Sequence, residues 1–206
     1  MARLGFNSEA QPERSTVAGW PVERVARRRF SAVSVVQSRP YIWPYHGAIK
    51  TKQTALVICV DVTDEIDETL PALSRLVELR DRAASAGVRV VHLPGVGCAP
   101  LLAPRPGELT VERPEFGGFT GTGLDLVLRG AGLTDLLMTG FPFELGADCT
   151  MREANDLGYE CLMVEDCCTG LSDQTLTGAV SSVQMSGGIF GVVATSTEVL
   201  AALSDL

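Results

Sequence analysis

TALVICVD, residues 54–61, is the stretch that decides the fold class. Its first seven residues form a short, mostly apolar run rich in β-branched side chains, which is typical of a strand buried on both faces of a parallel sheet. The run ends at Asp61, so this carboxylate is expected at the carboxyl end of the strand. Parallel α/β sheets bind their ligands at that edge. The stretch therefore predicts a buried strand and a candidate site residue directly after it.

The segments that follow alternate between helix and strand patterns. Residues 66–87 place leucines at helical spacing, and Gly87 is expected to end this helix. A Pro/Gly-rich loop is expected at 94–107. Further strands are predicted at 88–93, 135–141, 159–166 and 189–195, and further helices at 123–132, 146–158, 173–187 and 196–203. This order predicts an α/β fold, a Rossmann-like, doubly wound, mostly parallel sheet flanked by helices.

The residues before the first strand have a different character. Residues 1–40 show no sustained periodicity and are predicted to be a basic, loosely ordered N-terminal extension to an α/β domain of residues 41–206. Through residue 52 there are nine Lys and Arg against three Glu, a net charge of +6, whereas the remainder carries −14. The basic run 24–30 is expected to dock on the acidic body of its own or a neighbouring subunit. Apart from this basic run, nothing in the sequence favours binding to nucleic acid, and we expect no nucleic-acid partner.

Composition limits the class of protein. A chain of 206 residues with 46% apolar side chains suits one well-buried domain. No apolar run approaches the roughly 20 residues that span a bilayer, and we expect neither a membrane segment nor a signal peptide. Six cysteines without a CxxC spacing and only two histidines do not suggest a zinc site, so we expect no metal and no cofactor. Reduced thiols and a cytoplasmic location are the corresponding expectations.

Three places carry groups that could support chemistry. Asp61 ends the first strand, and Arg113 begins the segment RPEFGGFTGTGL, residues 113–124. The turn 141–149 leads into a helix whose free N–H groups could stabilise an oxyanion. Each has an ordinary explanation on its own, such as a helix cap for Asp61 or a surface ion pair for Arg113. Together they are expected to converge on one pocket at the carboxyl edge of the sheet.

Several motifs together resemble one family. PYIWPYHG (40–47), TALVICVD (54–61) and GGIFGVVAT (187–195) are similar to segments of the isochorismatase-like hydrolase superfamily. The resemblance extends over roughly residues 40–204 and is nearest to the biuret and ureidoacrylate amidohydrolases. It implies the α/β fold predicted above and a small-molecule substrate.

The resemblance also implies a catalytic Asp, Lys and Cys, and the chain departs from two of them. Asp61 matches the Asp, whereas Arg113 stands at the Lys position, and a guanidinium cannot shuttle a proton as a lysine can. Counting six residues from Gly140 reaches Gly146 at the position of the nucleophilic Cys. Cys149 would lie about 4–5 Å further along the helix axis, outside attack geometry.

The family geometry implies a cis peptide bond a few residues before the nucleophile position, which falls at Phe141–Pro142. That bond would turn backbone N–H groups inward as an oxyanion hole. The expected oxyanion or nucleophile-position residues are Pro142, Gly146 and Ala147, and the expected substrate contacts are Phe119, Phe143 and Glu144.

Three functions stay open at this point. The first is a thiol-free enzyme in which Asp61 carries out hydrolysis or acid–base chemistry on a small polar metabolite, for example in secondary metabolism. The isochorismatases resemble the family, also have Gly at the nucleophile position, and need an acid to protonate a vinyl ether. Arg113 could hold a substrate carboxylate there, although a guanidinium beside Asp61 opposes an acid role.

The second function is a catalytically silent binding or assembly partner, for example of an active paralogue. The third is an amidohydrolase that uses the displaced Cys149. In each case we expect a homo-oligomer, because the aromatic–proline segment and the basic extension need a surface to cover.

Overall fold

The computed structural model describes residues 16–17, 20–21, 49–62, 67, 70–95, 100–186 and 189–204. The chain divides into two units, residues 1–35 and 36–206. In the first unit, strand β1 (Thr16–Val17) pairs antiparallel with β2 (Trp20–Pro21). The other expectations for residues 1–40 and for the aromatic–proline segment lie outside the described residues.

A six-stranded, all-parallel sheet forms the centre of the second unit, in the order β5-β4-β3-β6-β7-β8. Its strands are β3 (Thr54–Val60), β4 (Arg89–Pro94), β5 (Leu109–Thr110), β6 (Asp135–Phe141), β7 (Glu160–Val164) and β8 (Val192–Ala194). Strand β3 lies between β4 and β6, and all seven of its residues are buried. The predicted α/β class and the doubly buried first strand are confirmed.

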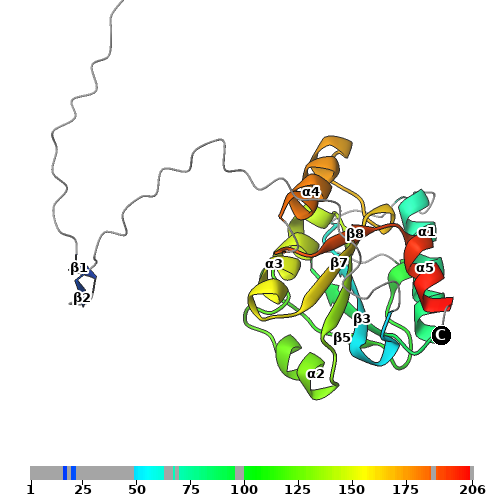
Figure 1. Ribbon diagram of the computed structural model, residues 1–206, viewed down its shortest axis with the longest axis horizontal. Helices are drawn as coiled ribbons and strands as arrows, with labels where there is room; N and C mark the ends of the chain where they lie inside the picture. The colour runs from blue at the N-terminus through cyan, green and yellow to red at the C-terminus, as the bar shows by residue number, and fades with distance from the viewer. Residues whose placement is uncertain are drawn as a thin grey trace, which may run out of the picture. The chain divides into compact units, whose positions relative to one another are not determined.

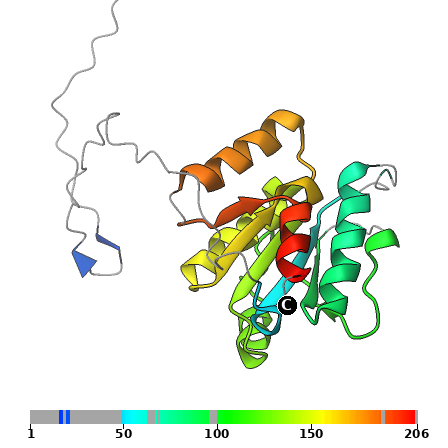
Figure 2. The same cartoon turned by 45° about the vertical axis from the view of Figure 1, so that its right-hand side comes forward.

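Helices cover both faces of this sheet (Figures 1 and 2). One face carries α1 (Pro71–Ser85) and α5 (Ser196–Ser204), and the other carries α2 (Leu124–Gly130), α3 (Asp148–Asp156) and α4 (Asp173–Met185). Short 3-10 turns lie at Thr51–Gln53 (η2), Pro100–Leu102 (η3) and Glu165–Cys167 (η5), and a π-helical turn lies at Phe143–Ala147 (η4). Alternate residues of β3 enter the two hydrophobic cores, which explains why its sequence lacks a polar face.

The element boundaries differ from the sequence predictions in a few places. The strand at 135–141 is found as predicted, and Gly87, with φ of +88°, follows the end of α1. Helix α1 begins at Pro71, later than predicted, because proline suits the first helical position and has no N–H to pair further in. The last strand is three residues long, shorter than the predicted 189–195. Strand β5 was missed because two residues show no alternation.

Within the described part of the chain, no helix has the length and apolar character needed to cross a membrane.

Candidate active site

Asp61 lies at the carboxyl edge of the sheet, directly after β3. Its backbone N–H donates to Phe141 O (2.7 Å), which continues the pairing of β3 with β6 past the strand end. Its carboxylate Oδ1 accepts a hydrogen bond from Arg113 Nη2. The side chains of Asp61 and Arg113 are only 5% and 1% exposed, so they form a buried ion pair.

Backbone carbonyls hold the rest of the Arg113 guanidinium. Nε donates to Leu93 O (3.2 Å), and Nη1 donates to Phe116 O (2.7 Å) and Glu115 O (3.3 Å). A guanidinium has five N–H donors in a planar fork, and these contacts together with Asp61 engage all three of its nitrogens. Its orientation is therefore fixed by the end of β4 and by its own loop.

Gly146 completes the contacts of the carboxylate and leaves room for the arginine. Its N–H donates to Asp61 Oδ2 (2.9 Å). A Cβ added at Gly146 would overlap Asp61 Oδ2 and lie 2.6 Å from Arg113 Cζ, and one added at Gly95 would lie 2.7 Å from Arg113 Nη2. The Asp61 carboxylate and the Arg113 guanidinium together thus occupy the space that a side chain at position 146 would need. The two departures from the family pattern, Gly146 and Arg113, therefore fit one another.

The turn after β6 brings Gly146 to this place. The Phe141–Pro142 peptide bond is cis, as the resemblance implied. Phe143 N donates to Thr169 O (2.8 Å), so the turn pairs with the segment after β7. Pro142 is buried, and Ala147 is buried against Gly140. The Gly146 N–H, expected to serve an oxyanion, is engaged by Asp61 and would have to leave it to bind a substrate.

The three expected substrate contacts have other partners in the structure. Phe143 is fully buried in the hydrophobic core on the α2–α4 side of the sheet. Phe119 is half-buried and packs on Tyr159, with ring centroids 5.4 Å apart. Glu144 accepts a hydrogen bond from Leu171 N (3.3 Å). Sequence spacing did not distinguish a side chain that flanks a site from one that packs behind it.

The two thiols nearest the ion pair in sequence, Cys149 and Cys59, have raised pKa values. Burial raises the pKa of Cys149, and the negative charges of Asp148 and Glu153 raise it further. Burial also raises the pKa of Cys59 to about 12. The cysteines within the described ranges, Cys59, Cys149, Cys161, Cys167 and Cys168, are free. A nucleophilic cysteine needs a lowered pKa, so none of the shifts found at Cys149 or Cys59 favours attack.

Two residues that the sequence analysis missed lie on α3 beside the pair. Thr150 Oγ1 donates to Gly146 O (2.6 Å) and accepts from Gly118 N (2.9 Å). Glu153 Oε2 accepts from Phe119 N (2.8 Å). The available signal was the spacing of four residues between Gly146 and Thr150 on a predicted helix.

A second buried arginine lies on α1. Arg80 is fully buried; its Nε donates to Glu108 Oε1 (2.8 Å), and its Nη2 donates to Glu108 Oε2 and to Ala103 O (2.8 Å). Its Nη1 donates weakly to Leu101 O (3.4 Å). Arg80 therefore holds the loop between β4 and β5 against α1.

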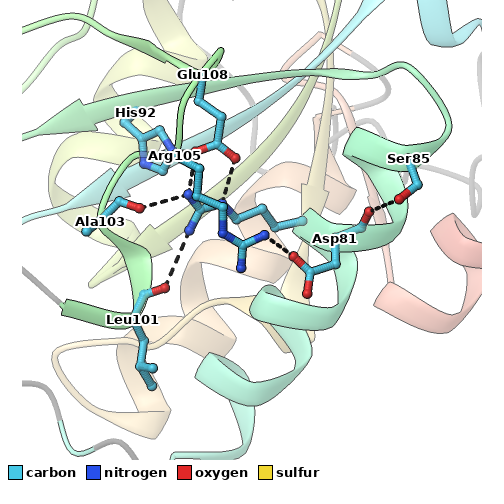
Figure 3. A network of polar contacts seen from close by, with 8 residues as sticks. Asp81, Ser85, His92, Leu101, Ala103, Arg105 and Glu108 are labelled. Atoms are coloured by element: carbon cyan, nitrogen blue, oxygen red, sulfur yellow. Dashed lines mark hydrogen bonds and ion pairs between the residues drawn. The ribbon is translucent and has the colours of Figure 1, made fainter.

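Figure 3 shows that His92 and Arg105 converge on the same Glu108 carboxylate. His92 Nε2 lies 2.8 Å from Oε2, and Arg105 N donates to that oxygen (2.7 Å). Burial raises the pKa of Glu108, but the hydrogen bonds from Arg80, Arg105 and His92 outweigh burial and lower it to about 2. Burial lowers the pKa of His92 despite the neighbouring carboxylate.

Metal-binding groups do not gather in the described ranges: no three His, Cys, Asp or Glu side chains there lie close enough to share an ion.

Residues 54–198 match the isochorismatase domain, and the chain belongs to this family. The resemblance noted in the sequence is thus confirmed.

Two curated relatives carry names that state an activity. The chain is 34% identical over 128 residues to streptothricin hydrolase of Streptomyces noursei, covering 55% of this chain and 45% of that protein. It is 31% identical over 104 residues to ureidoacrylate amidohydrolase RutB of Rhizobium rhizogenes, covering 50% and 42%. The chain thus spans less than half the length of either relative.

Solved structures share the fold at lower identity. A cysteine hydrolase from Pseudomonas syringae pv. phaseolicola superposes with a TM-score of 0.72 at 18% identity, over 82% of this chain and 98% of that one. An isochorismatase family protein from Burkholderia thailandensis gives 0.64 at 24% identity, over 74% and 96%. These similarities concern the fold.

Proposed function

We propose that the protein is a thiol-independent hydrolase of a small polar substrate, an amide or a related compound, in which Asp61 transfers the proton. The observation that carries this proposal is the geometry of the pair. Asp61 is retained at the carboxyl edge of the central strand, while the space of the family's thiol is filled by the Arg113 guanidinium. The names of the two curated relatives support hydrolysis, and that of the ureidoacrylate amidohydrolase supports an amide-type bond.

Without a thiol, water must be the nucleophile. Asp61 accepts hydrogen bonds from Arg113 and Gly146, and both are donors, so the carboxylate is arranged as a proton acceptor. It would take a proton from water as the oxygen attacks the substrate carbon, and return that proton to the leaving group when the bond to carbon breaks. Arg113 stays charged and does not act as a general acid or base, so its role is electrostatic: it stabilises negative charge that develops on the substrate.

The amidohydrolase that relies on Cys149 has less support. The raised pKa of this thiol keeps it protonated, and its position is three residues past the nucleophile position.

A binding or assembly protein is the second candidate, and one observation favours it. Arg113 and Asp61 are almost completely buried, and Arg113 donates its other hydrogen bonds to backbone carbonyls of the same chain. A substrate would have to displace at least one of these contacts to reach the carboxylate.

Turnover of a panel of isochorismate, biuret-like and ureido compounds by wild type and by Asp61→Asn separates the two candidates. The hydrolase proposal expects turnover of at least one compound and a loss of about 10²- to 10⁴-fold in the variant, with an unchanged circular dichroism spectrum. Binding of a compound without turnover by wild type would favour the second candidate. Equal turnover by the variant would remove Asp61 from the mechanism.

We also propose that the protein is a cytoplasmic homo-oligomer. Exposed apolar side chains on several elements support the oligomer. Among them are Leu126 on α2, Met185 on α4 and Ile189 before β8. Sedimentation at micromolar concentration that shows only monomer would contradict it.

A further inference from the structure

Thr150 connects two backbone segments that are distant in sequence. Its side chain is fully buried on α3, and its Oγ1 donates to Gly146 O (2.6 Å) one turn earlier. Such bonds from a helical threonine to the carbonyl four residues before it are ordinary. The same oxygen also accepts the N–H of Gly118 (2.9 Å), 32 residues earlier in the chain. One hydroxyl therefore serves as donor and acceptor at the same time.

One of these segments bonds to Asp61 and the other bonds to Arg113. Gly146 donates its N–H to Asp61 Oδ2 (2.9 Å). Two residues before Gly118, the carbonyl of Phe116 accepts from Arg113 Nη1 (2.7 Å), and Arg113 Nη2 donates to Asp61 Oδ1. The contacts close a ring that runs through Asp61, Gly146, Thr150, Gly118, Phe116 and Arg113.

The segment that holds Arg113 is pressed closely against α3. A Cβ added at Gly118 would lie 2.9 Å from Thr150 Cγ2, and one added at Gly117 would overlap the Glu153 carboxylate. Glu153 Oε2 accepts from Phe119 N (2.8 Å), a second point of attachment one helical turn along. The segment therefore has little freedom to shift while both contacts are in place.

From this ring we infer that Thr150 is a positioning residue, which sets the orientation of the Arg113 guanidinium on Asp61. Without the hydroxyl, Gly118 N and Gly146 O both lose a buried partner. The segment that carries the Phe116 carbonyl is then attached to α3 only through Glu153, so the guanidinium that this carbonyl supports gains freedom to turn. The inference rests on the proposed function, because Asp61 is there the group that reacts. The orientation itself can be measured without turnover.

The test compares three variants by the solvent exchange of the Arg113 Nε proton, observed by NMR and assigned by its disappearance in Arg113→Lys. Thr150→Val removes the hydroxyl and keeps the shape, and Thr150→Ser restores it. Thr139→Val is the matched control, since Thr139 is also fully buried and its hydroxyl donates to a carbonyl, Val57 O (2.9 Å), outside the ring.

We expect the exchange rate to rise about tenfold or more in Thr150→Val, the size expected for the loss of a buried hydrogen bond, and to stay within about threefold of wild type in Thr150→Ser and Thr139→Val. Equal acceleration in the two valine variants would show that Thr150 contributes only general stability, and would overturn the inference.

Amide exchange in the wild-type protein provides a second measurement if Thr150→Val does not fold. The Gly118 and Gly146 N–H groups should both exchange slowly, because both are buried and bonded. A Gly118 amide that exchanges as fast as an exposed loop amide would also overturn the inference. Neither exchange measurement depends on the turnover of Asp61→Asn. Failure of the hydrolase proposal can therefore be distinguished from failure of the positioning role of Thr150.

Discussion

Among the residues that the structure describes, two arginine–carboxylate pairs are buried, and they differ in how many hydrogen bonds the carboxylate accepts. Glu108 accepts from Arg80 at both oxygens, from the Arg105 N–H and from His92. Asp61 accepts two hydrogen bonds from the described residues, one from Arg113 and one from a backbone N–H. A carboxylate can accept about four, so Glu108 is saturated, whereas Asp61 retains capacity for a water molecule or a substrate.

The two arginines also differ in where they lie in the fold. Arg80 joins a helix to a loop, and its partners are a side chain and carbonyls of that loop. Arg113 sits at the carboxyl edge of the sheet against two glycines, Gly95 and Gly146, whose missing side chains make room for it. A buried Arg–carboxylate pair is therefore not by itself the mark of a site. The unused lone pairs and the place in the sheet are what distinguish Asp61.

The largest effect is expected at the Arg80–Glu108 pair, here called the saturated centre because its carboxylate accepts about four hydrogen bonds. Replacing Arg80 with methionine leaves Glu108 buried without its main partner and should lower the free energy of unfolding by about 3–5 kcal/mol. Arg129→Met is the control, because Arg129 pairs with Asp125 at the surface and should contribute less than about 1 kcal/mol. Urea denaturation measures both. A loss below about 1 kcal/mol for Arg80→Met would mean that the loop relaxes and exposes Glu108.

A smaller loss is expected when the space beside Arg113 is filled. Gly146→Ala should lower the free energy of unfolding by about 1–3 kcal/mol, because the added methyl group would overlap both Asp61 Oδ2 and the Arg113 guanidinium, which must shift to make room. In an Arg113→Lys background the cost of the same substitution should shrink, giving a positive coupling in a double-mutant cycle.

Gly178→Ala is the matched control for that cycle. Gly178 lies on α4 with nothing near its absent Cβ, so alanine should leave stability unchanged or raise it by up to about 1 kcal/mol. If Gly146→Ala costs the same in the Arg113→Lys background as in the wild-type protein, the proposed steric relation is wrong.

Acid should weaken the saturated centre in two steps. The pKa of His92 is lowered by burial, so its contribution to stability is complete above pH 6.5 and declines as the pH falls below that value. The pKa of Glu108 is about 2 against an ordinary 4.5, so its contribution is lost between pH 4.5 and 2. Urea midpoints from about pH 7.5 to 5 measure the first step, and His92→Gln should flatten it. An identical slope in the variant would assign the loss to other groups.

The smallest effect is expected at Cys149. Cys149→Ala should leave turnover within about twofold of wild type, and iodoacetamide should leave it near that of the untreated enzyme, because a protonated thiol outside attack geometry has no role. Loss of activity in step with modification of Cys149, with the fold intact, would restore the amidohydrolase interpretation.

Much of the fold was predictable from local pattern. The buried strands have runs of apolar residues that only a covered parallel sheet accommodates, as at 54–60 and 135–141. The pairing of Asp61, Arg113 and Gly146 could be anticipated because strand ends meet at one edge of the sheet and because counting from Gly140 reached Gly146 at the nucleophile position.

The remaining features of the fold and the site depend on tertiary contacts that produce no periodic pattern in the sequence. Arg80 lies among the charged residues of α1, and nothing in their order shows that one of them is buried against Glu108, 28 residues later. Thr150 resembles any small residue on a helix until Gly118 is placed beside it. Phe143 is apolar and next to the site in sequence, but its side chain points into the core.

The close fit between Arg113 and Gly146 constrains how the chain could change through single substitutions. A Cβ at position 146 would overlap both the Asp61 carboxylate and the guanidinium, so acquiring a cysteine there is disfavoured as long as arginine occupies position 113. The reverse holds for a chain that starts with both family residues, where the thiol must be lost before arginine fits. The steric contact therefore imposes an order on mutational paths between the two forms of the site.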